Sequence, residues 1–367
     1  MKTKALVVAV LGVVGGLATT LVVLKGKTTS TQKTLHVYTW TDYIDKQIIR
    51  EFEQKFNVKV VEENFPSNEV MISKIKAGGA GFDVIVPSDY VIASMKQDNL
   101  LMKLPREKIP NLVHLSERFR NVNYDETGEH VVPYMWGTTG FAYNSKKVEK
   151  PPKSWKEFFD VAKAQSSNKR ISLLDDPREV LGAALKANGI SLNSIQTDDL
   201  KKAKDTLLAF KPMVSRFDTM SYKDLLASGD LWMAQAYSGD IVKMQDQNPE
   251  LRYVIPEDGA TLWVDNLAIP SGAREPELAA EFINFVMTPE INQRIALSIH
   301  YGTTNDKARQ LLPQSELNNT SIYPPKEVEA RLELFKDLGN AIEAVDTAWA
   351  EVRTEDALPV EPPSAQR

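Results

Sequence analysis

From residue 35 onward, short apolar runs alternate with amphipathic segments, and this alternation constrains the fold more than any other feature. Runs rich in strand-forming residues occupy 35–40, 58–61 and 83–86. Between the first two, Ile48, Phe52 and Phe56 recur at the spacing of one helix face. A repeated strand–helix order predicts an α/β fold, with parallel sheets and helices on both faces. All-helical and all-strand architectures are therefore excluded.

The same pattern continues far along the chain. Further strands are predicted at 170–174, 232–237 and 262–269, and helices at 70–77, 89–96, 177–187, 241–247, 276–287 and 289–299. The chain has 367 residues and shows no internal repeat. One hydrophobic core seldom grows to serve a chain of this length. We therefore expect two doubly wound lobes.

The two ends of the chain differ from its body. Lysines flank an uncharged stretch at 5–24, which as a helix would span about 30 Å, the thickness of a bilayer core. Residues 1–33 are therefore predicted to be a signal peptide or an N-terminal membrane anchor with a polar tether. Either one would deliver the rest of the chain outside the cytoplasm. The proline-containing segment 353–367 is predicted to be a disordered tail.

Composition excludes several classes of function. The net charge is −5 and no long basic run occurs, which argues against nucleic-acid binding. Cysteine is absent, so thiolate catalysis, cysteine-based zinc sites, disulfides and a lipidated cysteine are excluded. The 4 histidines are far apart and lack metal-binding spacing. We expect no metal, no cofactor and no catalytic residue.

Aromatic and acidic side chains dominate the positions that follow or lie within the predicted strands. Open parallel sheets bind ligands beyond the carboxyl ends of their strands, so these positions are candidate ligand contacts. Aromatic faces attract ammonium groups, and carboxylates hold them by charge-assisted hydrogen bonds. The combination favours an elongated organic cation. The candidates are Trp40, Asp42, Tyr43, Ser88, Tyr90, Asp176, Glu179, Tyr237, Asp240, Trp263 and Asp265.

Each of these residues also has a structural interpretation. Asp176, followed by Pro177 and Glu179, is a good helix N-terminal capping box, and one residue can both cap a helix and face a ligand. Asp89 can likewise cap a helix, and the aromatic residues can be core residues. Asp265 is different, because an unpaired carboxylate buried in an apolar strand costs several kcal/mol. It requires a cationic partner or solvent.

Several segments resemble the spermidine/putrescine-binding proteins of ABC importers. They are YTWTDYI, FPSNEV, FDVIVPSDY, PYMWGTTGFAYN, SLLDDPREV, WVDNLAIP and IYPP, in the order of that family and within residues 35–352. The resemblance implies a class II periplasmic-binding fold whose lobes close around a polyamine at a hinge. It implies lobe 1 at 34–141 and 265–310, and lobe 2 at 142–264 and 311–352. It also implies a monomeric, non-enzymatic receptor whose partners are a polyamine and the permease subunits of the transporter.

The resemblance also implies individual roles. Trp40 and Tyr43 would be ring walls with Asp42 between them, and Ser88 and Tyr90 would line the first lobe's side of the cleft. The remaining roles fall to residues of the other matching segments. Asp176 and Glu179 would hold an amine, Tyr237 would replace a usual tryptophan, Trp263 and Asp265 would form the central anchor, and Tyr301 would lie near the mouth.

Two departures leave the preferred polyamine open. Phe335 stands where spermidine binders commonly carry glutamine, whereas Asp240 resembles the putrescine-preferring branch. Spermidine and putrescine therefore both remain candidates. Thiamine or iron binding by the same fold, and a hydrolase using Asp176 and Glu179 as paired acids, are the alternative functions. For iron, the tyrosine pairs that commonly serve as ligands are missing from the sequence.

Overall fold

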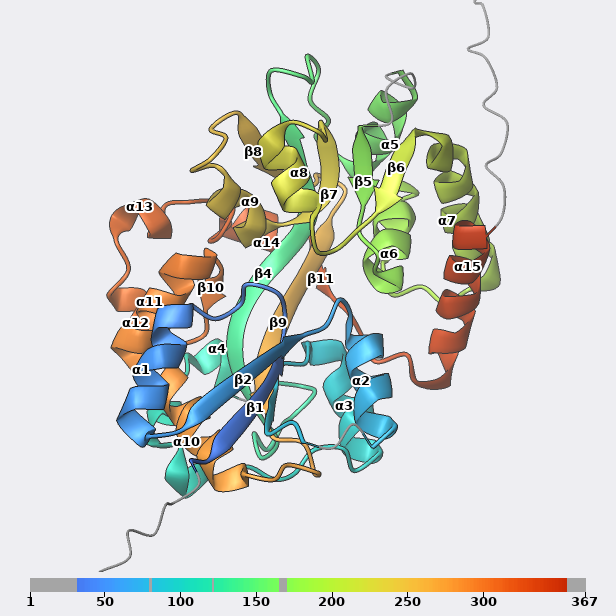
Figure 1. Ribbon diagram of the computed structural model, residues 1–367. Helices are drawn as coiled ribbons and strands as arrows, with labels where there is room; N and C mark the ends of the chain where they lie inside the picture. The colour runs from blue at the N-terminus through green and yellow to red at the C-terminus, as the bar shows by residue number, and fades with distance from the viewer. Residues whose placement is uncertain (1–31, 79–80, 121, 165–169, 355–367) are drawn as a thin grey trace, which may run out of the picture. The chain divides into compact units, whose positions relative to one another are not determined.

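The computed structural model describes residues 32–78, 81–120, 122–164 and 170–354, and from Lys33 they form one unit built around a single sheet (Figure 1). The predicted N-terminal leader at 5–24 and nearly all of the predicted tail lie outside the described residues. The sheet has the strand order β2-β1-β3-β9-β4-β7-β5-β6, with β10 and β8 on β4 and β11 on β9. The strands are β1 Thr34–Thr39, β2 Lys59–Asn64, β3 Val84–Ile85, β4 Val131–Asn144, β5 Ile171–Leu173, β6 Val214–Phe217, β7 Met233–Tyr237, β8 Leu251–Val254, β9 Ala260–Ala268, β10 Gly302–Thr303 and β11 Leu332–Leu334.

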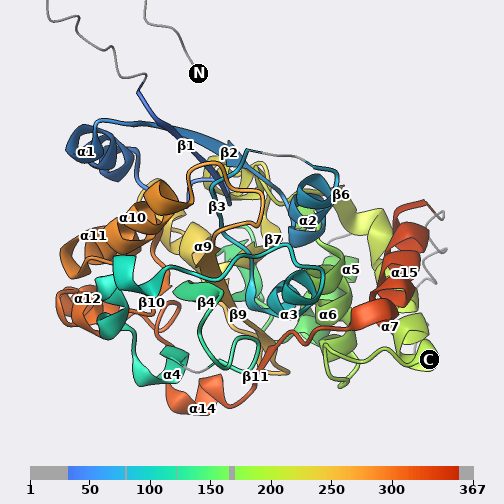
Figure 2. The same cartoon turned by 90° about the horizontal axis from the view of Figure 1, so that it is seen from below.

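Helices fill most of the connections between the strands. They are α1 Lys46–Phe56, α2 Asn68–Lys76, α3 Asp89–Gln97, α4 Glu117–Arg120, α5 Trp155–Ala164, α6 Pro177–Ala187, α7 Thr197–Phe210, α8 Tyr222–Ser228, α9 Ser238–Met244, α10 Pro276–Val286, α11 Pro289–Ile299, α12 Asp306–Gln310, α13 Gln314–Leu317, α14 Lys326–Glu329 and α15 Ile342–Thr354. Figures 1 and 2 show α10 and α11 on one side of β1 and α2 and α3 on the other. The predicted α/β class, with helices on both faces, is confirmed.

The direction of the strands is only partly as predicted. β1 runs parallel to β2 and β3, and β5 runs parallel to β6 and β7. In the middle of the sheet, β9 is antiparallel to β3 and β4, and β4 is antiparallel to β7. The sheet is therefore mixed rather than parallel. The sequence pattern did not identify β4 as a strand, because Pro133, Gly137 and Gly140 interrupt its apolar run.

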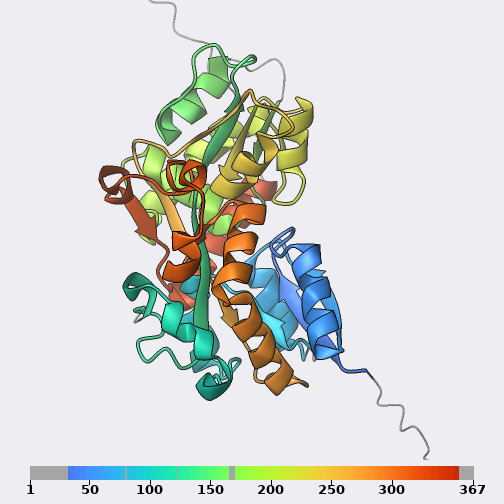
Figure 3. The same cartoon turned by 90° about the vertical axis from the view of Figure 1, so that its left-hand side faces the viewer.

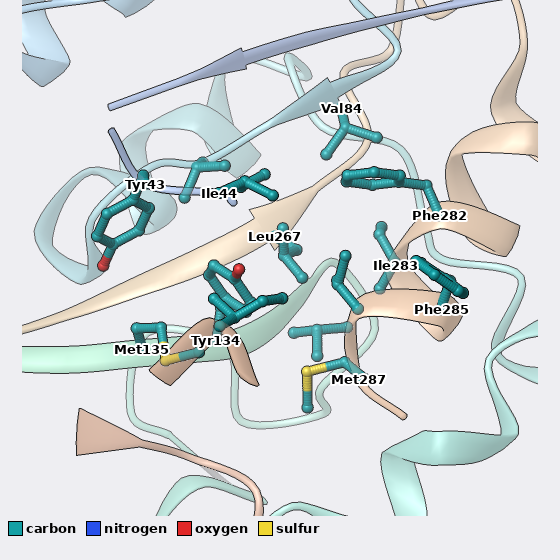
Figure 4. Close-up of a cluster of buried hydrophobic side chains, with 14 of the residues drawn as sticks. Tyr43, Ile44, Val84, Tyr134, Met135, Leu267, Phe282, Ile283, Phe285 and Met287 are labelled. Atoms are coloured by element: carbon teal, nitrogen blue, oxygen red, sulfur yellow. The ribbon is translucent and has the colours of Figure 1, made fainter. Parts of the chain in front are cut away.

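β4 and β9 connect two separately packed halves of this unit. Figures 1 and 3 show β4 running from the half with α1 and α10 into the half with α5 and α6. One core surrounds β1, α1, α10 and α11, and Figure 4 shows part of it, with Tyr43 at one end of the cluster and Phe285 at the other. A second core surrounds β7, α5, α6 and α7, and a third, smaller one lies around β3, α2 and α3. Separate cores on the two sides of shared strands are the expected two-lobed α/β architecture.

Local sequence signals explain where the site-bearing helices begin. The Asp176 side chain caps α6 by accepting a hydrogen bond from the backbone amide of Glu179 at 3.1 Å, and Pro177 is the first helical residue. Proline also opens α10 and α11. Ser88 precedes α3 but makes no capping hydrogen bond with its side chain. Within the described ranges, none of the helices is long and apolar enough to span a bilayer.

Candidate functional site

A single cavity collects the side chains that sequence analysis placed at the strand ends. Its space is about 850 Å³, with the open mouth included. Every one of the twelve candidates lines it: Trp40, Asp42, Tyr43, Ser88, Tyr90, Asp176, Glu179, Tyr237, Asp240, Trp263, Asp265 and Tyr301. They come from six separate segments, so the fold brings together residues that are distant in sequence. The cavity thus lies where open α/β sheets commonly bind ligands.

Asp265 on β9 is a deeply buried acid of the cavity. It is 4% exposed, and its two oxygens accept hydrogen bonds from the Tyr43 hydroxyl at 2.6 Å and the Ser88 hydroxyl at 2.7 Å. Burial raises the pKa of Asp265 to about 6, although both hydrogen bonds favour the ionised form. The carboxylate is therefore held in position by neutral donors.

Asp176 and Glu179 form a second acidic group at the start of α6. Glu179 accepts hydrogen bonds from the hydroxyls of Thr139 and Thr261, each at 2.8 Å. Burial, together with the charge of Glu69, raises the pKa of Asp176 to about 7. Burial and the charge of Asp176 raise the pKa of Glu179 to about 8. The charge of Arg178 lowers the pKa of each acid but does not outweigh burial, so both acids hold protons to higher pH than exposed acids do.

Aromatic rings form the walls between these acids. The Trp263 ring meets the Tyr301 ring edge-on at 5.0 Å and the Tyr237 ring edge-on at 6.1 Å. Gly137 permits this arrangement, because a Cβ there would lie 2.5 Å from the Trp263 ring. The Trp40 indole is fixed by donating to the Val86 carbonyl at 3.0 Å. The walls are thus held rigidly by packing and hydrogen bonds.

A third charged cluster lies on the same cavity and contains a lysine. The Lys223 ammonium is 3.0 Å from an oxygen of Asp42 and 3.9 Å from an oxygen of Asp240. Burial opposes the charge of Lys223, but Asp240 and Asp42 outweigh it and raise the pKa of the lysine. Burial also acts on Asp42, yet the hydrogen bond and charge of Lys223 outweigh it and lower the pKa of Asp42. Here the acids already have a cation.

Sequence analysis missed several residues of the cavity wall. Lys223 is the most important, and no sequence signal marks it, because it lies within helix α8 rather than at a strand end. The ring of Phe335, which sequence analysis noted only as a departure, packs edge-on against Tyr90 at 5.5 Å. The Arg178 guanidinium lies over the same two rings, 4.4 Å from the centre of Phe335. The other lining residues not predicted are Thr41, Phe65, Pro66, Asn68, Thr219, Met220, Lys243 and Ile299.

The structural interpretations of these residues are partly correct as well. Asp176 both caps α6 and lines the cavity. Tyr43 and Trp263 belong to the first core and also face the cavity. Ser88 is different, because its hydroxyl donates to Asp265 and leaves the helix end uncapped. In the part of the chain that the structure describes, no group of three or more His, Asp or Glu side chains is arranged to hold a metal ion.

Known proteins share both the sequence and the fold. Residues 47–325 match the family described as bacterial extracellular solute-binding protein. The putrescine-binding periplasmic protein SpuD of Pseudomonas aeruginosa is 34% identical over 338 residues, which cover 88% of this chain and 92% of that protein. The putrescine-binding periplasmic protein PotF of Escherichia coli is 32% identical, covering 90% of this chain and 94% of that protein.

A solved structure agrees with these relatives. The structure described as a putative spermidine/putrescine ABC transporter from Listeria monocytogenes superposes with a TM-score of 0.83 at 36% identity. The superposition covers 88% of this chain and 99% of that one. The relatives are binding proteins of transport systems rather than enzymes. This chain belongs to the bacterial extracellular solute-binding protein family.

Proposed function

We propose that this chain captures a linear polyamine, putrescine or spermidine, between its two lobes and delivers it to the permease of an ABC importer. The observation that carries the proposal is the cavity itself. Three carboxylates, those of Asp265, Asp176 and Glu179, are buried there among aromatic rings, with hydroxyl groups and backbone amides as their hydrogen-bond donors in the described part of the chain. The charge of Arg178 lowers the pKa of Asp176 and Glu179 but does not outweigh their burial, so these acids can still gain from the ammonium groups that a polyamine supplies.

The chemistry of binding follows from these environments. A buried carboxylate keeps its proton to higher pH than an exposed one does. The pKa values of Asp176, Glu179 and Asp265 are all raised in this way. An arriving ammonium group would stabilise the ionised form and displace the proton. The faces of Trp263 and Tyr237 would cover the methylene groups between the charges and add cation–π attraction. Binding is then a replacement of protons by ammonium groups.

We propose that the two lobes meet within β4 and β9 and that these strands form the hinge. The division at 34–141 with 265–310, and at 142–264 with 311–352, stays a prediction. One segment favours a change to it, because Leu312, Ile322 and Tyr323 pack in the core around α10 and α11. Val345 and Val352 on α15 pack in the other core. Residues 312–323 therefore fit the first lobe better.

The proposed place of action is outside the cytoplasm. The relatives are named periplasmic proteins, and the family is described as extracellular. We propose that segment 1–33 directs the export of the chain, either as a cleaved signal peptide or as an anchor that keeps it at the outer face of the membrane. We further propose that the exported chain acts as a monomer.

Calorimetric titration of the purified chain tests the proposed ligand. We expect saturable one-to-one binding of putrescine or spermidine, and no heat of binding from glutamate or maltose. Thiamine and iron, included in the same panel, test the alternative ligands. The proposal is wrong if thiamine or iron binds and the polyamines do not, or if the chain turns a polyamine over into products.

A further inference from the structure

Lys223 places a cation of the protein itself inside the cavity. The residue is 5% exposed, and its ammonium group bridges two acids that approach from different parts of the chain. Asp42 lies in the turn after β1, where its φ of 58° places it in the left-handed region that few side chains adopt. Asp240 lies on α9. The bridge to Asp42 joins residues 181 positions apart.

The acceptor atoms of Asp240 already have partners in the protein. One oxygen accepts a hydrogen bond from the Tyr222 hydroxyl at 2.8 Å. The other accepts one from the Tyr301 hydroxyl at 3.2 Å and faces Lys223 at 3.9 Å. Tyr222 is fully buried, so its hydrogen bond is shielded from water. A ligand ammonium at Asp240 would therefore compete with these groups for the carboxylate.

The other acids of the cavity present the opposite situation. Asp265 is held by two hydroxyl groups, and Glu179 by two threonine hydroxyls. A buried carboxylate gains most from a ligand cation when no side-chain cation has already neutralised it. Arg178 acts on Asp176 and Glu179 without outweighing their burial, so the attraction for ligand charge is concentrated at Asp265 and at the Asp176–Glu179 pair.

We propose that the Lys223 ammonium occupies the place of one ligand ammonium, so that the cavity selects amines with two positive charges over amines with three. This inference rests on the proposed polyamine function and specifies the class of ligand. One ammonium group pairs with Asp265 and the other with Asp176 and Glu179. A third ammonium finds the remaining carboxylates, Asp42 and Asp240, already sharing the positive charge of Lys223, which weakens their attraction for a further cation.

The variant Lys223→Met tests this role, because methionine retains much of the length of the side chain and removes its charge. Calorimetry on the full chain gives the dissociation constants of putrescine and spermidine before and after the change. We expect the ratio of the two constants to move toward spermidine by about tenfold, because Asp42 and Asp240 become available to a third ammonium group. A Lys223→Arg variant, which keeps the charge, should keep the original ratio.

Two further variants identify the source of the change. Lys243→Met removes the charge of another lysine of the cavity wall, which lowers the pKa of Asp42 less than Lys223 does, and should move the ratio toward spermidine by less than Lys223→Met does. Adding Asp240→Asn to Lys223→Met should cancel the gain for spermidine. Thermal unfolding of each unliganded variant establishes that it is folded, and Lys223→Gln replaces Lys223→Met if the latter is not.

The possible outcomes separate this inference from the proposed function. An unchanged ratio in Lys223→Met contradicts the inference and leaves the polyamine function standing. A uniform loss of affinity for both amines also contradicts it, because that result would assign Lys223 to holding the lobes together. If the unsubstituted chain binds neither amine, the proposed function fails and the inference fails with it.

Discussion

The two charged regions of the cavity use carboxylates in opposite ways. Around Asp265 and the Asp176–Glu179 pair, hydroxyl groups and backbone amides hold the acids, and burial raises their pKa values although the charge of Arg178 acts against it at the pair. Around Asp42 and Asp240, the ammonium of Lys223 supplies the counter-charge, and the pKa of Asp42 is lowered despite its partial burial. In the unliganded protein, burial disfavours the ionised form of the acids in the first region. In the second region, the charge of Lys223 already stabilises the ionised acids.

This difference shows why counting acids is a poor guide to ligand charge. Five carboxylates line the cavity, those of Asp42, Asp176, Glu179, Asp240 and Asp265. What matters is which of them lacks a cation when the ligand is absent, because only those gain fully from an ammonium group. Substitutions in the first region should therefore change affinity strongly, and the effects should become smaller as the change moves from charge to packing.

Asp265→Asn should cause the largest loss. The amide preserves the size of the side chain but removes the charge at the centre of the cavity, and losing one partner of a desolvated charge pair costs about 2–5 kcal/mol. Calorimetry with putrescine or spermidine measures the loss. Asp89→Asn is a matched control, since burial raises the pKa of Asp89 well above its ordinary value and its side chain lies outside this cavity. Equal affinities of Asp265→Asn and the parent would remove Asp265 from the site.

Glu179→Gln should change affinity and stability in opposite directions. Affinity for the amine should fall by about 1–3 kcal/mol, because a charge-assisted hydrogen bond is lost. The unliganded variant should be at least as stable as the parent at pH 9, because the parent must then bury an ionised carboxylate whose pKa is about 8. Calorimetry and thermal unfolding at pH 9 measure the two effects. A stable variant with full affinity would show that Glu179 does not meet the ligand.

The pH dependence should follow the raised pKa values of Asp265, Asp176 and Glu179. The folded chain keeps protons that the unfolded chain loses near pH 4, so the stability of the unliganded protein should fall as pH rises from about 4 to 8. Amine affinity should rise over pH 5.5–8.5, by about tenfold per pH unit for each proton displaced. Titrations at pH 7 in buffers of different ionisation enthalpy should show proton release. Affinity that is independent of pH would contradict the raised values.

Gly137→Ala should have the smallest effect on affinity. The added Cβ would lie 2.5 Å from the Trp263 ring, and overpacking of this kind costs about 1–3 kcal/mol of stability. Displacement of the ring should weaken amine binding only a few-fold, because the carboxylates remain. Gly272→Ala is the control, since a Cβ there has no neighbour within 4 Å. Thermal unfolding and calorimetry on both variants measure the difference, and identical behaviour would show that the ring tolerates displacement.

Much of the site could be predicted because it follows local rules. Asp176 and Glu179 belong to a helix-start pattern directly after a strand, and α6 occupies the predicted range Pro177–Ala187. Trp263 and Asp265 are two positions apart in β9, so their side chains lie on the same face of the strand. The carboxyl ends of parallel strands meet at one edge of a sheet, so the residues after β1, β3, β5 and β7 could be placed together without coordinates.

The remaining features depend on contacts between distant segments. Lys223 is the second residue of α8, and nothing near it in the sequence indicates its pairing with Asp42. The antiparallel course of β4 was missed because glycines and a proline disguise the strand. Phe335 was noted as a difference from the family, but its contact with Tyr90 could not be predicted. That contact arises only when β11 is placed beside β9. In each case tertiary packing decides what the local sequence leaves open.

A crystal structure of the chain with bound putrescine or spermidine tests the unequal use of these acids most directly. We predict ammonium nitrogens at hydrogen-bonding distance from Asp265 and from Asp176 or Glu179, with the Lys223 ammonium still bridging Asp42 and Asp240. A ligand nitrogen seated on Asp240, with Lys223 turned out of the cavity, would contradict this account.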